Sequence, residues 1–148
     1  MNQPTADQAL NEMQPLVGEW ALEAIAPGGE PWPADARATI EWHHSGAHLV
    51  ERTTIELPDA PDATKIMGCD AANGTYCQLY ADDRGVCRAY EMSIGDGEWR
   101  LWRTGEPFSQ RFIGRFEDDD NTIVGRWENA KDGKNYETDF DLIYRKIN

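Results

Sequence analysis

The feature that most constrains this chain is a series of about ten short segments in which apolar and polar residues alternate, joined by turn residues. Alternation with a period of two is typical of strands that bury one face. Short, evenly spaced strands without a long crossover helix favour an antiparallel barrel over β–α–β units. We therefore expect an all-β fold, an up-and-down antiparallel β-barrel of about ten strands. The expected strands cover residues 17–26, 37–44, 48–57, 64–71, 75–82, 86–94, 98–103, 108–117, 122–128 and 136–146.

The segment before the first strand has a different periodicity. Its apolar residues recur at helical spacing over about residues 5–16, with Thr5 or Asp7 as a possible N-cap. A chain of 148 residues is long enough to bury a core as one domain. We expect a single domain over residues 1–148, with a short amphipathic helix closing one end of a barrel that spans about residues 17–146.

The turns predict which side chains share a face. A three-residue loop Asp83-Arg84-Gly85, with Gly85 in the left-handed region, places Tyr80 opposite Arg88 and Gln78 opposite Tyr90. Reading Gly95-Asp96-Gly97 in the same way places Tyr90 opposite Trp102, although a slip of one residue there would reverse the middle strands. In the later strands the aromatic face points inward, because the other face is charged.

The lengths of the loops predict a cup. Loops after even-numbered strands are short, whereas residues 27–33 and 58–62, after odd-numbered strands, are long and rich in proline. The long loops should surround an open mouth, and the N-terminal helix should cover a closed base. We expect Trp20 and Arg145 to form a structural plug at this base, with the guanidinium stacked on the indole.

Composition excludes several classes of partner. The net charge of −13 argues against nucleic acid and anionic membrane surfaces, which need a basic footprint. No stretch approaches the roughly 18 apolar residues of a membrane-spanning helix, and the first residues do not resemble a signal peptide. The three cysteines, Cys69, Cys77 and Cys87, are an odd number, so we expect reduced, buried thiols and a cytoplasmic location.

A metal site is not expected. The cysteines lack paired C-x-x-C spacing. If Ser45-Gly46-Ala47 is a loop, His44 and His48 face each other, but no third metal ligand is evident in the sequence. The simpler interpretation is that these histidines and His43 are exposed residues of a turn. The run Asp118 to Asn121 lacks the glycine and distal glutamate of a calcium loop, so we expect a solvated hairpin.

The motif Gly18-Glu19-Trp20, combined with Arg145 in the last strand, resembles the calycin superfamily of lipocalins and fatty-acid-binding proteins. Residues 16–20, 108–112 and 139–142 are similar to an uncharacterised bacterial lipocalin-like family. The resemblance implies a barrel that holds a small molecule in its lumen.

Two departures from the relatives matter. Fatty-acid-binding proteins place two helices between the first two strands, and the three prolines within residues 27–33 forbid helices here. Nitrobindins, which bind haem, carry a haem-ligating histidine late in the chain, whereas no histidine follows His48 in this sequence. Haem is therefore not expected, and no other cofactor is implied.

The function that we expect is non-enzymatic binding of a small, mostly apolar ligand that carries an acid or carbonyl group. A few polar groups among aromatic side chains are typical of such pockets. Arg88-Ala89-Tyr90 also resembles the Arg-x-Tyr pair with which fatty-acid-binding proteins hold a carboxylate, although it falls on a different strand. Alternatively, Arg88 pairs with an internal carboxylate such as Glu51 or faces solvent. The candidate ligand-binding residues are Trp42, Gln78, Tyr80, Arg88, Tyr90, Trp102, Gln110 and Phe112.

Two other functions remain open from the sequence. The lumen could support an acid–base enzyme of the isomerase or cyclase type that uses Tyr80, Tyr90 or Glu51. Alternatively, bulky side chains could fill the lumen, and the protein would act through its surface or as a homodimer.

Overall fold

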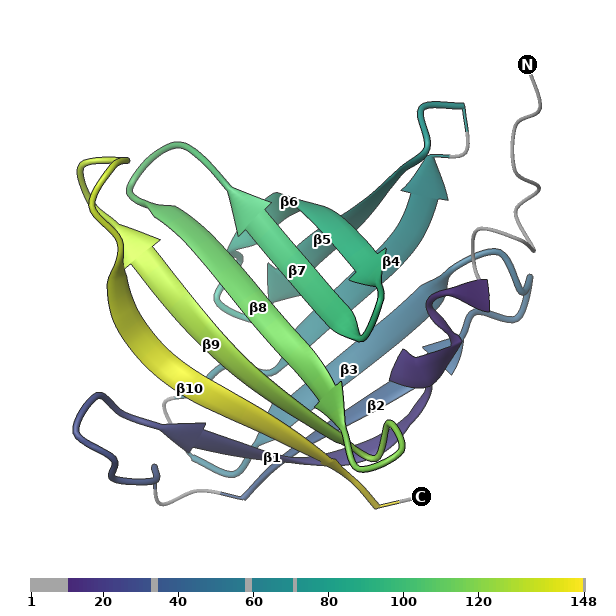
Figure 1. The fold of residues 1–148 in the computed structure, drawn as a ribbon, viewed down its shortest axis with the longest axis horizontal. Coiled ribbons are helices and arrows are strands. Elements are labelled where there is room, and N and C mark those ends of the chain that lie inside the picture. Colours follow the sequence, from purple (N-terminus) through teal and green to yellow (C-terminus); the bar gives the residue numbers. More distant parts are fainter. Residues whose placement is uncertain (1–10, 33–34, 58–59, 71, 148) are drawn as a thin grey trace.

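Ten antiparallel strands close into one barrel in this computed structural model, which describes residues 11–32, 35–57, 60–70 and 72–147 (Figure 1). Each strand pairs with its neighbours in sequence, and β1 pairs with β10. Every predicted strand lies within two residues of its expected ends, so the predicted up-and-down barrel is confirmed. The strands are β1 Gly18–Ile25, β2 Ala36–Trp42, β3 Leu49–Ile55, β4 Ala63–Asp70, β5 Thr75–Asp82, β6 Cys87–Gly95, β7 Glu98–Arg103, β8 Ser109–Glu117, β9 Thr122–Ala130 and β10 Glu137–Lys146.

The N-terminal segment covers the base of the barrel. The helix expected over residues 5–16 lies partly outside the described residues, which begin at residue 11, and where it was expected to end the structure has a 3-10 turn, η1 Gln14–Leu16. Met13 and Leu16 are fully buried, and Trp20 Nε1 donates to the Leu16 carbonyl at 2.9 Å. This contact fixes the segment across the end at which β1 begins. Among the described residues, no helix is long and apolar enough to cross a membrane.

Aromatic side chains fill the base half of the barrel. Trp20 meets Tyr144 edge-on at 6.0 Å, and Trp99 meets both Tyr144 and Phe112 in the same way. All four side chains are 2% exposed or less. Such edge-to-face packing of large rings leaves little space. The lower half of the lumen is therefore a packed core.

Two glycines make room for Phe112 in this core. Gly114 on β8 pairs with Gly125 on β9. A Cβ on Gly114 would lie 2.9 Å from the Phe112 ring, and one on Gly125 would lie 2.4 Å from it. Both distances are too short for ordinary packing, so the ring occupies the space that two side chains would need.

The hairpin between β6 and β7 corrects the predicted register by one residue. Gly95 pairs with Glu98, so the connection is the two-residue turn Asp96-Gly97, and both turn residues have positive φ, 54° and 78°. An Asp-Gly turn with two positive φ values matches the twist of a hairpin better than a three-residue loop. Trp102 consequently pairs with Glu91 on the outer face, and Leu101 and Trp99 point inward. The predicted Asp83-Arg84-Gly85 loop, by contrast, is found, with Tyr80 opposite Arg88 and Gln78 opposite Tyr90.

The predicted stacking of Arg145 on Trp20 is also corrected. Trp20 pairs with Lys146, and Lys146 Nζ lies 4.9 Å from the centre of the Trp20 ring. Side chains alternate along β10, so Tyr144 and Lys146 share the inner face and Arg145 points outward. There Arg145 binds Glu23 at 2.9 Å, and both side chains are more than one third exposed.

The cysteines and histidines differ in part from expectation. All three thiols are free, but Cys77 and Cys87 are exposed instead of buried. At the β2–β3 turn, His43 N donates to the His48 carbonyl, so His43 rather than His44 faces His48, with ring centres 4.5 Å apart. Burial and the neighbouring histidine charges lower the pKa of His43. The described residues contain no group of three or more His, Cys, Asp or Glu that could hold a metal ion.

Candidate ligand-binding site

A cavity of about 300 Å³ occupies the mouth half of the barrel. Its volume is at the lower end of the range for small-molecule sites, about 300–1,000 Å³. Residues from both long loops, Trp32 and Pro61, contribute to its rim. The open end of the barrel is thus the end with the long loops, as the lengths of the loops predict.

The cavity has one apolar wall and one polar wall. The apolar wall comes mainly from β1, β2, β9 and β10, with Trp32 from the first long loop packed 5.2 Å from Phe140. The polar wall comes from β4, β5, β6 and β8 and from the β5–β6 turn. The apolar side chains are Leu22, Ala24, Trp32, Ala36, Trp127, Phe140 and Leu142; the polar ones are Lys65, Gln78, Tyr80, Arg84, Arg88, Tyr90 and Gln110.

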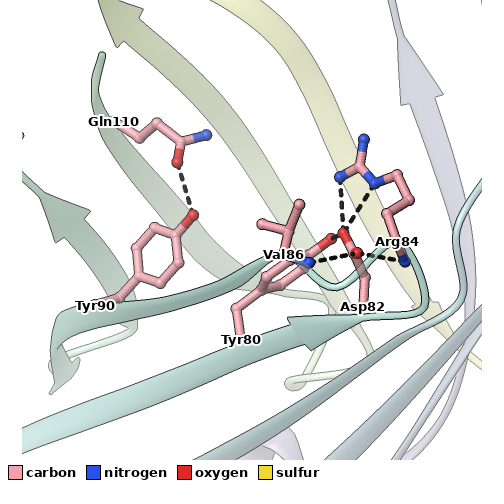
Figure 2. A network of polar contacts seen from close by, with 6 residues as sticks. All are labelled: Tyr80, Asp82, Arg84, Val86, Tyr90 and Gln110. Atoms are coloured by element: carbon pink, nitrogen blue, oxygen red, sulfur yellow. Dashed lines mark hydrogen bonds and ion pairs between the residues drawn. The ribbon is translucent and has the colours of Figure 1, made fainter. Parts of the chain in front are cut away.

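Asp82 organises the polar wall near the mouth (Figure 2). Its carboxylate accepts hydrogen bonds from the Tyr80 hydroxyl at 2.7 Å, from the Arg84 guanidinium at 2.7 Å and from the Val86 backbone at 3.3 Å. The bonds from Arg84, more than any other contact, lower the pKa of Asp82 well below its usual range. Burial and the bond to Asp82 raise the pKa of Tyr80 to about 12. The carboxylate therefore stays ionised, the phenol stays neutral, and both charges of this network are compensated.

A second contact joins β6 and β8 on the inner face of the polar wall. The Tyr90 hydroxyl on β6 donates to Gln110 Oε1 on β8 at 2.7 Å, and Figure 2 shows these two side chains pointing toward each other. Burial raises the pKa of Tyr90, and a hydrogen bond from Arg88, followed by the positive charges of Arg88 and Arg103, opposes part of this rise. Tyr90 thus acts as a neutral hydrogen-bonding group beside two cations.

Arg88 differs from the other cations of this region. Lys65 is bound to Glu51, Arg84 is bound to Asp82, and Arg103 donates to the backbone carbonyls of Glu106 and Phe108. Arg88 has no carboxylate partner among the described residues. Its guanidinium lies 5.5 Å from the centre of the Phe108 ring. It is therefore available to an anion that enters the cavity.

A buried ion pair lies deeper in the lumen. Glu51 on β3 is completely buried, and its Oε2 accepts from Lys65 Nζ at 2.7 Å and from Thr53 Oγ1 at 2.8 Å. Burial, and then the negative charge of Glu51, raise the pKa of Tyr144 well above its usual value. Lys65, Thr53 and Tyr144 all line the cavity, so the charge of Glu51 lies directly behind its surface.

The structure brings together five of the eight predicted ligand-binding residues. Gln78, Tyr80, Arg88, Tyr90 and Gln110 line the cavity, and Trp42, Trp102 and Phe112 do not. Trp42 lies at the base, where its Nε1 donates to Gln14 Oε1 at 3.1 Å. Phe112 belongs to the packed core, and Trp102 is placed outside by the register of β7.

Sequence reasoning missed Lys65, Arg84 and Trp32 as lining residues. Lys65 alternates with its neighbours on β4 so that it shares a face with Ala63 and Met67, and it pairs with Tyr80. The register between β4 and β5 could therefore have predicted that Lys65 points into the lumen. The position of Arg84 follows from its bonds to Asp82, and the alternation of residues along a strand does not predict where the side chain of a turn residue points. Trp32 reaches the cavity because its backbone donates to Ala24 at 2.8 Å and folds the loop back over the mouth. None of the three histidines lines the cavity.

Comparisons with known proteins identify the fold alone. The chain matches no protein-family model and no curated protein. Among solved structures it is similar to the crystal structure of Rv2717c from M. tuberculosis, with 13% sequence identity and a TM-score of 0.65. The match covers 95% of this chain and 98% of that chain. At this identity the likeness supports a shared barrel architecture and no statement about a ligand.

Proposed function

We propose that this protein is a non-enzymatic, calycin-like binder of a small carboxylic acid with an apolar body, held in the mouth half of the barrel. The observation that carries the proposal is Arg88, a cation that lines an otherwise compensated cavity and has no carboxylate partner among the described residues. A ligand carboxylate would supply that partner through charge-assisted hydrogen bonds. The apolar body would pack on Trp127, Phe140 and Leu142 of the opposite wall.

The division of the lumen supports a small ligand. The packed base excludes a long chain from the lower half, and about 300 Å³ remains above it. A barrel filled throughout, acting only through its surface, agrees less well with this open upper half.

Binding agrees with the electrostatics of the lumen better than acid–base catalysis does. A general acid or base works best when its pKa is near the working pH. The raised pKa values of Tyr80, Tyr90 and Tyr144 move all three phenols away from that range. These phenols stay protonated and are therefore unsuited to remove a proton from a ligand.

Calorimetric titration with phenylacetate and octanoate, each compared with its neutral amide, tests the proposal. Loss of one charged hydrogen bond corresponds to roughly 1.5–3 kcal/mol, so Arg88→Met should weaken the acids about ten- to a hundredfold and leave the amides unchanged. Arg100→Met is the matched control, because Arg100 binds Glu98 on the outer face. Equal affinity of an acid for wild type and Arg88→Met, or no binding of either acid, would overturn the proposal.

The natural ligand can be identified without prior assumption. Native mass spectrometry of the purified protein, followed by solvent extraction, should reveal a small acidic compound that Arg88→Met does not retain. We further propose that the protein acts in the cytoplasm, because its three cysteines are free thiols. Recovery of a disulfide from the protein in its native cells would contradict that location.

A further inference from the structure

Two buried acceptor atoms next to the cavity lack a donor. Gln78 is 2% exposed, and its Oε1 has no hydrogen-bond partner among the described residues. The same holds for Oε1 of Glu51, whose other oxygen binds Lys65 and Thr53. A third buried atom without a partner, Trp99 Nε1, is a donor and lies outside the cavity lining. A buried polar atom without a partner is rare and destabilises the folded state, so it needs an explanation.

Of these two residues, Gln78 is the one that lines the cavity. Its Oε1 is itself buried, so the amide would have to turn toward the lumen to meet a ligand donor. It pairs with Tyr90, two residues further along β6 than Arg88. Two residues of strand span about 7 Å, so Gln78 lies about that much nearer the base than Arg88. The polar wall thus has a cation without a carboxylate partner near the mouth and an unsatisfied acceptor deeper in the lumen.

This arrangement selects a ligand with two different ends. A carboxylate at the mouth would satisfy Arg88, and a hydrogen-bond donor at the far end would satisfy Gln78 Oε1. An ammonium donor would need a carboxylate partner, and Glu51 and Asp82, the carboxylates beside the cavity, are already bound to Lys65 and Arg84. A hydroxyl carries no charge and can both donate to Gln78 and accept from a neighbouring donor.

We propose that the ligand is a hydroxy acid, a small molecule with a carboxylate at one end of an apolar body and a hydroxyl at the other. This inference rests on the proposed function and specifies the class of acid. The apolar wall of Trp127, Phe140 and Leu142 would contact the body between the two polar ends, and a flat ring suits the aromatic part of that wall.

A comparison of phenylacetate with 4-hydroxyphenylacetate tests the inference by calorimetry. In the wild-type protein the hydroxyl should tighten binding about tenfold, as expected for one satisfied buried acceptor. Gln78→Met should abolish this advantage, so that the two acids bind the variant with equal affinity. Arg88→Met should weaken both acids by the same factor and preserve their ratio. A cooperative thermal unfolding transition verifies that Gln78→Met is folded.

The outcomes separate the two proposals. If both acids bind through Arg88 but the hydroxyl gives no advantage, the hydroxy-acid inference is overturned and the proposed function stands. A hydroxyl advantage that survives Gln78→Met overturns the inference in the same way. If neither acid binds the wild-type protein, the proposed function fails and the inference fails with it.

Discussion

Gly125→Ala should destabilise the barrel, because a methyl group has no space at this position. The new Cβ would lie 2.4 Å from Phe112 Cε1 and 3.0 Å from the Leu142 carbonyl oxygen. The Phe112 ring is confined by Trp99 and Trp127, with ring centres 5.2 and 5.1 Å away. Overpacking of a filled core costs about 1–3 kcal/mol. For a loss of about 2 kcal/mol, the melting temperature of a protein of this size should fall by about 4–8 °C.

Two further variants isolate the cause in denaturant and thermal unfolding. Gly68→Ala is the control, because its Cβ would meet only His48 Cβ at an ordinary 3.7 Å, so stability should be unchanged or slightly higher. Combining Gly125→Ala with Phe112→Leu removes the clashing ring atoms. The double variant should therefore lose less stability than the sum of the two single variants, with a coupling of about 0.5–3 kcal/mol. A Gly125→Ala protein as stable as wild type would refute the tight packing of Phe112.

Three more outcomes can be measured. Trp20→Ala should lower the free energy of unfolding in urea by about 3–5 kcal/mol through the cavity that it leaves. Arg145→Ala, which removes one partner of an exposed ion pair, should change it little. Equal effects of the two substitutions would contradict the placement of Arg145 outside the barrel. Because Arg84 lowers the pKa of Asp82 in the folded state, this carboxylate stabilises the fold above its unfolded pKa of about 3.9 and less as the pH falls below it. Asp82→Asn should therefore destabilise the protein at pH 7 and reduce its loss of stability on acidification, and an unchanged pH dependence would contradict this role. Cys69, the least exposed thiol and one whose pKa is raised by burial, should react last with a thiol reagent in the native protein; equal rates for all three thiols would argue against its placement.

The order of the strands and the two ends of the barrel could be predicted, because they depend on local patterns. Alternation and turn residues locate each strand, and the three-residue loop ending in Gly85 sets the register that brings Tyr80 and Arg88 together. The wrongly predicted register of β7 also has a local cause, the length of a single turn. Asp96-Gly97 forms a turn one residue shorter than predicted, and a shift of one residue moves every side chain of the strand to the other face.

The deeper part of the site could not be predicted, because no short turn links its members. Glu51 and Lys65 lie on β3 and β4, and the long connection between these strands leaves their register open in the sequence. The position of Arg84 over the cavity depends on its side-chain conformation and its bonds to Asp82. The division of the lumen into a packed base and an open mouth depends on how the volumes of many side chains add up, which a pattern of alternation does not specify.

The most direct test of a ligand site in the mouth half is a methyl NMR titration with 4-hydroxyphenylacetate. We expect the methyl signals of Leu22, Ile55 and Leu142, which line the cavity, to shift on binding. The signals of Leu49 and Ile123, which belong to the packed base, should stay in place. Shifts confined to the exposed Ile66 and Leu79 of the outer face, or no shift at saturating ligand, would contradict binding in the lumen.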